Sequence, residues 1–213
     1  MNRNIIITAG PSFEPIDDVR RLTNLSTGTL GCTLANRLTA AGYHVTLLLG
    51  EMSSYRGPIN AKTVIPFSTG ADLLQHLQTL ARQPCRAVLH AAALADFKVH
   101  QMQDGQNRVL ACEKIPSNIP EIKIVLRPAP KIIRQLRGLF PAAVLVGWKY
   151  ELEGEKAAAA LRAQNQIIAC KTDACILNGK AYGDGYGYCT PDNAITHLPD
   201  VAALGDKLAA LLP

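Results

Sequence analysis

Apolar and polar residues follow one another along the chain as expected for strands that alternate with helices. Isoleucines at 5–7 predict a buried first strand, and a second apolar run covers 44–50. Between them Leu30, Leu34 and Leu38 recur at helical spacing, in a helix that we expect to begin near Thr27. Strand, helix and strand in this order predict a βαβ unit, and therefore a parallel sheet with right-handed crossovers.

The same alternation continues and predicts one α/β domain over residues 1–213. We expect a Rossmann-like, doubly wound, mainly parallel sheet with helices on both faces. Further strands are expected at KTVIPF (62–67), RAVLHAAA (86–93), IKIVL (122–126), AVLVG (143–147), DACILN (173–178) and 194–198. Helices are expected at 71–82, 130–137, 153–168 and the C-terminal end, and a Gly/Tyr-rich loop at 183–188.

One stretch departs from this pattern. Residues 97–102 and 108–113 have the composition of two strands around a turn at Asp104 and Gly105. We expect a β-hairpin arm or flap, inserted at about 97–121, that is suited to packing on a second subunit.

The composition narrows the possible functions. The chain has 213 residues, of which 48% are apolar and 5% aromatic, and a formal charge of +5. Its cations are scattered, and no apolar run approaches the roughly 20 residues of a membrane helix. We therefore expect a cytoplasmic protein with no nucleic-acid or membrane partner. The six cysteines are irregularly spaced and include no C-x-x-C pair, which favours free thiols over a metal cluster.

Residues 5–31 hold the main candidate site. The first strand ends in a small-residue turn at Gly10, and Gly28 and Gly31 lie around the predicted start of the first helix. Backbone N–H groups at a helix start, next to glycines that let a ligand approach, form an anion site. Because parallel strands end at the same edge, we expect Asp96 to face the same cleft as Gly10. Other polar residues expected there are Asn24, Ser26, Lys114, Lys149, Glu151 and Asn178, a set suited to positioning phosphoryl groups.

Other motif-based functions are less well supported. The turn after the first strand reads A-G-P-S, and not the G-x-G-x-x-G of nicotinamide cofactor sites. Glu51 follows the second strand, where such enzymes carry an acidic residue, so a nicotinamide-dependent oxidoreductase stays open as an alternative. The sequence contains no P-loop, nucleophile elbow or H-E-x-x-H motif.

Six blocks, in order and spanning nearly the whole chain, resemble the phosphopantothenoylcysteine synthetase (phosphopantothenate–cysteine ligase) family of coenzyme A biosynthesis. They are ITAG…EPIDDVR…TNLSTGTLG, HAAALADF, EKI with a later RPAPKII, VGWKYE, DACILN and GYGYCTPDN. The resemblance implies a carbon–nitrogen ligase. The carboxylate of 4′-phosphopantothenate attacks the α-phosphate of CTP or ATP with Mg²⁺, and the amine of cysteine then displaces the nucleotide.

The resemblance also implies a homodimer with sites shared across its interface. We do not expect the flavin-dependent decarboxylase domain that is often fused upstream, because Met1 lies almost at the first strand. A divergent relative that joins another carboxylate to an amine stays open as an alternative.

The resemblance assigns site residues by position. It places Gly10, Ser26, Gly28, Gly31, Trp148 and Asn178 at the nucleotide, and Asn24, Ala92, Ala93 and Asp96 at phosphopantothenate. Asn24 also matches an amide that helps to hold the acyl intermediate. Arg20 matches an arginine that reaches the substrate from the neighbouring subunit, and Lys114 a mobile-loop lysine that closes over the phosphates. Asn24, Lys114 and Arg20 are therefore the catalytic candidates, and no metal ligand is assigned.

The sequence departs from the family pattern at three places. Pro11 stands in the usual G-G-T turn and removes one N–H from the expected triphosphate wall. The loop at 114–117 reads K-I-P-S where many bacterial members have K-I-K-K, and Gly179 replaces the last residue of A-N-D. These differences leave the choice between CTP and ATP, and the exact substrate, open.

Overall fold

The computed structural model describes residues 3–211, and its centre is one eight-stranded sheet in the order β12-β11-β10-β9-β6-β1-β4-β5. The strands from β10 to β5 are parallel, whereas β11 is antiparallel to both of its neighbours. Their bounds are β1 (Asn4–Ala9), β4 (His44–Gly50), β5 (Thr63–Phe67), β6 (Ala87–His90), β9 (Val144–Tyr150), β10 (Ala174–Asn178), β11 (Tyr186–Cys189) and β12 (Ile195–Leu198). The predicted doubly wound α/β fold is confirmed.

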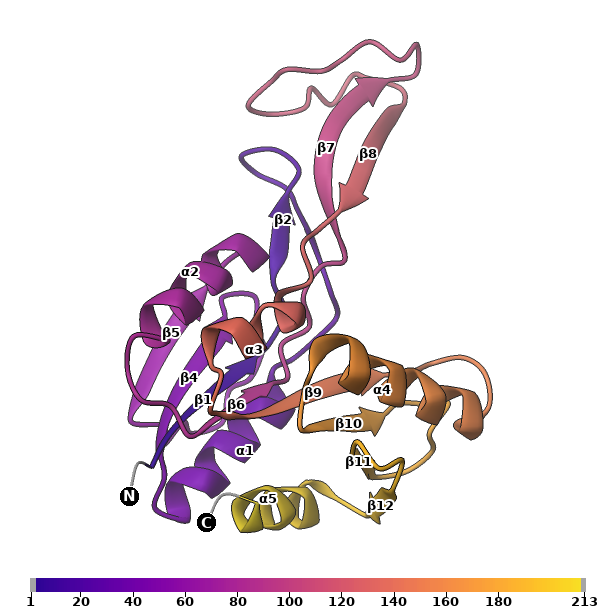
Figure 1. Cartoon of the computed structure of the whole chain (residues 1–213). Coiled ribbons are helices and arrows are strands. Elements are labelled where there is room, and N and C mark those ends of the chain that lie inside the picture. Colours follow the sequence, from indigo (N-terminus) through magenta and orange to yellow (C-terminus); the bar gives the residue numbers. More distant parts are fainter. Residues whose placement is uncertain (1–2, 212–213) are drawn as a thin grey trace.

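Helices cover both faces of this sheet (Figure 1). Alternate residues of β1 belong to different clusters: Ile5 and Ile7 pack with α1 and α5, and Ile6 packs with α2 and α3. On β10, Cys175 and Leu177 pack beneath α4. The helices are α1 (Thr29–Ala40), α2 (Gly70–Leu80), α3 (Leu136–Leu139), α4 (Lys156–Cys170) and α5 (Val201–Ala210), with the short 3₁₀ helix η1 (Ile132–Arg134) before α3. Apolar runs in the parallel strands thus reflect burial on both faces.

The arm is built from different strands than the sequence predicts. β7 (Phe97–Asp104) pairs with β8 (Ile122–Pro128), so the assignment of 122–126 to the central sheet was wrong. The arm extends away from the body of the molecule, above the small hairpin of β2 (Phe13–Pro15) and β3 (Arg21–Thr23) (Figure 1). An apolar run usually indicates a buried strand, but Ile122 and Ile124 are 38% and 40% exposed.

The turn expected at Asp104 and Gly105 forms, but the expected partner strand at 108–113 does not. The carboxylate of Asp104 accepts hydrogen bonds from the N–H groups of Gln106 and Arg108, both at 2.9 Å. It also lies 2.6 Å from Nε of Arg108. One isolated bridge between Gln103 and Val109 is the pairing that this segment makes with β7. The N–H of Leu110 still donates to the carbonyl of Met102 at 2.9 Å, so this segment follows β7 briefly without forming a strand.

The predicted loop at 183–188 was also partly wrong, because β11 lies within it. Gly187 is the residue that gives this strand the sequence pattern of a loop. A Cβ atom there would lie 2.8 Å from the ring of Tyr182, so this glycine makes room for an aromatic side chain inside a strand.

Helix α1 packs closely on β1. A Cβ atom added to Gly31 would lie 2.4 Å from Cβ of Ala9 and 3.2 Å from its Cα. Gly31 and Ala9 are both buried, so moving the helix and strand apart would lose packing between them. Gly31 therefore sets the distance between the first helix and the first strand.

We predict that Gly31→Ala lowers the free energy of unfolding by about 1–3 kcal/mol, because the added methyl group overpacks this contact. Urea denaturation of both proteins measures the difference. The matched control is Gly138→Ala in α3, where a Cβ meets nothing within 4 Å. Alanine should leave stability there unchanged or raise it by less than about 1 kcal/mol. Equal stabilities of the two variants would contradict the packing role of Gly31.

Candidate functional site

The site lies where the fold reverses direction. The chain passes from β1 to β4 on one side and later returns to β6 on the other, so the topological switch point lies between β1 and β6. In open α/β sheets, ligands bind beyond the carboxyl ends of the strands at this point.

The N-terminus of α1 opens at this edge. Its N-cap is Gly28, with φ 79°, and no side chain caps the helix in the described chain. The preceding carbonyl, of Thr27, accepts hydrogen bonds from Oγ of Ser53 at 2.7 Å and from the N–H of Tyr55 at 3.1 Å. The N–H of Thr29, the first residue of α1, donates to Oγ1 of Thr27 at 3.2 Å. The other first-turn N–H groups have no side-chain cap in the described chain, and the helix dipole favours an anion there.

Gly10 lies against this helix start. A Cβ on Gly28 would lie 3.3 Å from Cα of Gly10 and 2.6 Å from Oγ of Ser53. Gly10 has φ +77°, a conformation that strains other residues. The N–H of Ser26 donates to the carbonyl of Asn24 at 2.9 Å, just before the helix. The structure thus brings together the predicted residues Gly10, Ser26 and Gly28, while Gly31 has the packing role described above.

Pro11 extends the pairing of β1 and β6 without losing a hydrogen bond. It forms a parallel bridge with Ala93 in which Ala93 makes both bonds. The N–H of Ala93 donates to the carbonyl of Gly10 at 2.9 Å, and its carbonyl accepts from Ser12 at 3.2 Å. Since the residue opposite Ala93 needs no N–H for this pairing, proline is tolerated there.

Asn24 is fixed beside the same bridge. Its Nδ2 donates to the carbonyls of Ala93 and Leu94, at 3.1 and 3.0 Å. Because both partners are acceptors, the amide oxygen remains available to a ligand. The adjacent Ala92 donates its N–H to Oγ1 of Thr8 at 3.2 Å. The sequence-predicted substrate residues Asn24, Ala92 and Ala93 therefore lie together.

Ser12 is a residue of this segment that the sequence analysis missed. It is fully buried, and its Oγ accepts a hydrogen bond from the N–H of Ala95 at 3.0 Å. The sequence feature that could have indicated Ser12 is a small polar residue directly after the A-G-P turn. Ser12 thus supports the backbone on which Ala92 and Ala93 lie.

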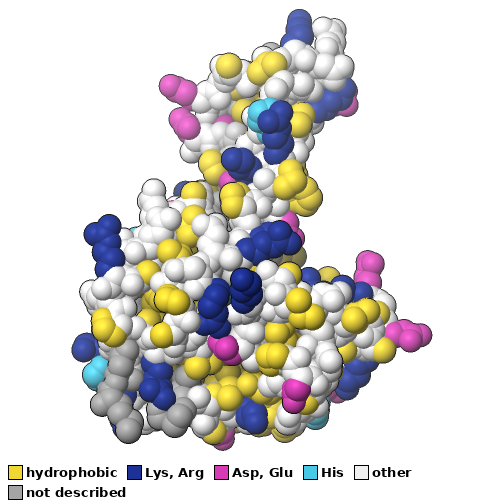
Figure 2. Space-filling model, viewed as in Figure 1, with side chains coloured by type: hydrophobic (Ala, Val, Ile, Leu, Met, Phe, Trp, Pro, Cys, Tyr) yellow, Lys and Arg dark blue, Asp and Glu magenta, His cyan; other side chains and the backbone are white. Residues whose placement is uncertain are grey.

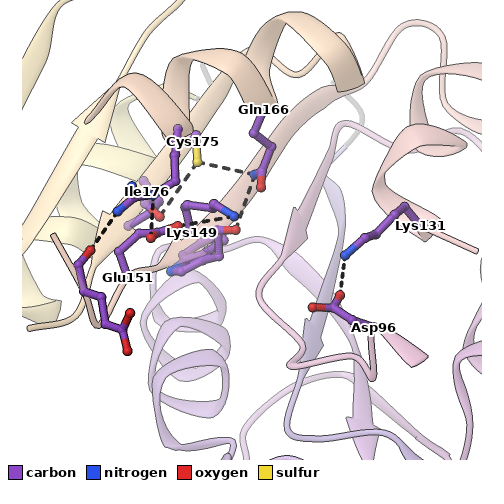
Figure 3. A network of polar contacts seen from close by, with 10 residues as sticks. Asp96, Lys131, Lys149, Glu151, Gln166, Cys175 and Ile176 are labelled. Atoms are coloured by element: carbon purple, nitrogen blue, oxygen red, sulfur yellow. Dashed lines mark hydrogen bonds and ion pairs between the residues drawn. The ribbon is translucent and has the colours of Figure 1, made fainter. Parts of the chain in front are cut away.

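Asp96 lies further along the same edge. Its carboxylate forms an ion pair with Nζ of Lys131, and both side chains are more than half exposed (Figure 3). The carbonyl of Asp96 accepts from the N–H of Ala129 at 2.9 Å. Lys131 belongs to the RPAPKII block but was not predicted as a site residue. The pair leaves a cation and a carboxylate together at the mouth of the site.

Trp148 and Asn178 lie on neighbouring strands, on the face that α1 covers. Trp148 is paired in register with Ile176, two residues before Asn178. Both Val146 and Ile176 pack in the cluster that contains α1, so this face is shared. Within the described chain, Nε1 of Trp148 and Oδ1 of Asn178 are buried without a hydrogen-bond partner. They provide one unused donor and one unused acceptor.

The opposite face of these strands carries a closed ionic network (Figure 3). The carboxylate of Glu151 lies 3.3 Å from Nζ of Lys149 and 2.6 Å from Nε of Arg162. Gln166 on α4 donates to the carbonyl of Trp148 at 3.3 Å and lies 3.4 Å from Sγ of Cys175. Lys149 and Glu151, expected at the cleft, thus neutralise each other and tie β9 to α4.

The backbone geometry at the ends of β9 and β10 explains why position 179 is a glycine. Its φ is +105°, and a Cβ there would lie 2.5 Å from the carbonyl oxygen of Glu151. The N–H of Glu151 donates to the carbonyl of Asn178 at 2.8 Å. Glycine is therefore required where β9 and β10 end together.

Arg20 and Lys114 lie at a separate depression beside the arm. It has a volume of about 510 Å³ and is lined by Arg20, Lys114, Ile115, Pro116, Ser117 and Asn118. Nη1 of Arg20 lies 2.5 Å from Oδ2 of Asp17. The structure thus brings the two predicted cations together, and the contribution of Arg20 to a neighbouring subunit stays a prediction.

His90 is a buried titratable residue at the end of β6 that the sequence analysis did not single out. Its Nδ1 lies 3.0 Å from Oγ1 of Thr8. Since Thr8 accepts from Ala92, its own hydroxyl proton is free to be donated to His90. Burial lowers the pKa of His90 from 6.5 to about 4, so the imidazole is neutral at pH 7.

The fold is a doubly wound α/β domain, and an open helix N-terminus at its switch point is an arrangement suited to anions. The profile of one family, the DNA/pantothenate metabolism flavoprotein C-terminal domain, matches residues 1–203. The chain belongs to this family, which includes the phosphopantothenoylcysteine synthetase domain of the bifunctional protein CoaBC.

Two curated relatives support this assignment. The coenzyme A biosynthesis bifunctional protein CoaBC of Thermococcus kodakarensis is 31% identical over 183 residues, which are 85% of this chain and 42% of that protein. A cysteine/cysteine sulfinic acid decarboxylase from an unknown prokaryotic organism is 33% identical over 196 residues, 91% of this chain and 50% of that protein. The chain thus spans half or less of the length of these relatives.

Two solved structures share the fold. The DNA/pantothenate metabolism flavoprotein of Streptococcus pneumoniae superposes with a TM-score of 0.86 at 24% identity, over 98% of this chain and 97% of that one. A mutant of Cab2 in complex with phosphopantothenate-cysteine gives 0.72 at 19% identity, over 99% and 88%. Among residues 3–211, no helix is long and apolar enough to cross a bilayer.

We predict that protonation of His90 destabilises the fold in mild acid. Its pKa is lower in the folded than in the unfolded chain, so stability is lost as the pH falls from 6.5 towards 4. For this residue the loss between pH 7 and pH 5 amounts to about 2 kcal/mol. Denaturation curves should show a pH dependence that is smaller by that amount in His90→Asn. The exposed His44→Asn is the control and should follow the wild type, whereas equal slopes in all three proteins would contradict the prediction.

Proposed function

We propose that this chain is a phosphopantothenate–cysteine ligase that uses CTP or ATP. The observation that carries the proposal is the contact of Gly10 with the uncapped start of α1, beside Asn24 and Ala93. This arrangement offers a phosphate site next to an amide that a carboxyl substrate can reach. Membership of the family favours the ligase over a nicotinamide-dependent oxidoreductase. The Cab2 complex adds support, because that protein shares the fold and holds phosphopantothenate-cysteine.

The proposed reaction has two steps. A carboxylate oxygen of 4′-phosphopantothenate attacks the α-phosphorus of the nucleotide, the bond to the bridging oxygen breaks, and pyrophosphate leaves. The amine of cysteine then attacks the acyl carbon of the mixed anhydride, loses a proton and releases the nucleoside monophosphate. Anhydride formation supplies the leaving group that a free carboxylate lacks. The protein's part is to align the reactants and to stabilise charge on the phosphates.

Several of the predicted residues have a part in this scheme. The first-turn N–H groups of α1 hold the phosphates, and the unused groups of Trp148 and Asn178 face the base. The free amide oxygen of Asn24 orients the acyl group. Asp96, with its partner Lys131, contacts the polar end of phosphopantothenate.

Mg²⁺ is proposed to come with the nucleotide. The described residues contain no group of three or more His, Cys, Asp or Glu side chains that could hold a metal ion. Mg²⁺ commonly keeps several waters and binds mainly through substrate phosphates, which fits a site with few carboxylates. Its chemistry here is to neutralise phosphate charge.

We also propose that the protein is a cytoplasmic homodimer. The arm supports this, since it extends from the body and carries exposed apolar side chains together with basic ones (Figure 2). Phe97 is 49% and Val109 61% exposed. A second subunit would bury such side chains.

A pyrophosphate-release assay tests the proposed function. We expect release with phosphopantothenate and CTP or ATP, and formation of the cysteine amide when cysteine is added. No release with either nucleotide would refute the ligase. Release with phosphopantothenate but no amide with cysteine would indicate a different amine acceptor.

We predict that Asn24→Ala lowers kcat for amide formation by about 100-fold or more, as loss of one preorganised polar group commonly does. Nucleotide affinity and stability should change little, because Asn24 is exposed and lies outside the helix start. Steady-state kinetics and equilibrium nucleotide binding measure the two effects. Gln78→Ala, an exposed change on α2, is the control. Wild-type turnover in Asn24→Ala would remove Asn24 from the site.

A further inference from the structure

Two segments that lie far apart in the sequence meet at the carboxylate of Asp17. On one side, Oδ1 accepts hydrogen bonds from the N–H groups of Val19 and Arg20, at 2.9 and 2.7 Å. On the other, Oδ2 accepts from the N–H of Ile115 at 3.1 Å and lies 2.5 Å from Nη1 of Arg20. The Asp17 side chain has no exposed surface. It therefore joins the β2–β3 turn to the segment 113–118.

Further contacts hold the same junction. The guanidinium of Arg20 donates to the carbonyl of Ile115, at 3.5 Å from Nη1 and 3.4 Å from Nη2. The N–H of Asp18 donates to the carbonyl of Glu113 at 2.9 Å. The side chain of Ile115 is 3% exposed, whereas Lys114 beside it is exposed. The segment is thus fixed on both sides of Lys114, and Lys114 itself is left free to contact a ligand.

We propose that Asp17 is a positioning residue that docks segment 113–118 and so presents Lys114 next to Arg20 for the anionic groups of the substrates. This inference rests on the proposed function. Its basis is that Arg20 and Lys114 line the same depression of about 510 Å³. Without the carboxylate, two like-charged side chains would be brought together with no group to offset their repulsion.

The charge of Asp17 fits this role. Burial of the carboxyl opposes ionisation, but the hydrogen bonds from Ile115, Val19 and Arg20 outweigh it and lower the pKa of Asp17 to about 2. The carboxylate is therefore ionised under physiological conditions.

The two carboxylate oxygens have separate partners, which makes a specific variant available. In Asp17→Asn, the amide oxygen retains the bonds to Val19 and Arg20 N–H within the turn. The amide nitrogen then replaces Oδ2 and faces two other donors, the N–H of Ile115 and the guanidinium. The variant should release segment 113–118 and keep the local turn. Asp18→Asn is the matched control, because Asp18 is an exposed neighbour that contributes here through its backbone.

Hydrogen exchange of the full chain without ligands tests the docking. We expect amide exchange over 113–118 to be at least about tenfold faster in Asp17→Asn than in the wild type and in Asp18→Asn. The rest of the chain should exchange as before. Unchanged exchange in Asp17→Asn, or equal acceleration in Asp18→Asn, overturns the inference. This measurement does not depend on ligase activity.

A double-mutant cycle in the pyrophosphate-release assay tests whether Asp17 acts through Lys114. We expect Asp17→Asn to lower kcat/KM about tenfold, with Asp18→Asn at the wild-type value. In a Lys114→Ala background, Asp17→Asn should have little further effect, because the residue that it positions is gone. Fully additive losses would show a general structural role and overturn the inference. If the wild type releases no pyrophosphate, the proposed function fails, and hydrogen exchange alone decides the docking.

Discussion

The close approach of α1 to β1 is the contact on which the site depends. Because residue 31 is a glycine, α1 lies directly on Ala9, the last residue of the first strand. The start of the helix therefore opens at the point where the chain leaves β1 through Gly10. The loop after β4 completes this corner, since Ser53 and Tyr55 both hold the carbonyl of Thr27. The surface suited to an anion thus consists mainly of backbone donors rather than long side chains.

The periodicity of apolar residues was sufficient to predict the sheet and most helices. Strands such as β1 and β6 are buried on both faces, so their sequences are apolar throughout and easily recognised. The rule that parallel strands end at one edge then predicted one cleft for Gly10, Asn24 and Asp96, whereas Ala93 was assigned by the family resemblance. The same reasoning failed for 122–126, where an equally apolar run forms an exposed arm strand. An apolar sequence favours burial of a strand, but it does not show whether the core of the same chain buries that strand.

The contacts between charged residues could not be predicted from the sequence. Asp96 pairs with Lys131, and Glu151 with Arg162 of α4, across separations that depend on how the chain folds. Taken singly, each of these side chains has the local pattern of a solvated surface charge. Only the fold distinguishes a closed network, such as that of Glu151, from an open pair at the mouth of the site.

Two of the departures from the family pattern, Pro11 and Gly179, have an explanation in the backbone. Pro11 lies opposite Ala93 in a bridge that needs no proline N–H, and Gly179 lies where the carbonyl of Glu151 leaves no room for a side chain. Both residues lie where strand ends meet, and neither change removes the helix start or Asn24. Phosphate binding at the first-turn N–H groups requires none of the altered side chains. In the proposed ligase the triphosphate is common to CTP and ATP, so the choice of nucleotide is expected to depend on Trp148 and Asn178, the residues assigned to the base.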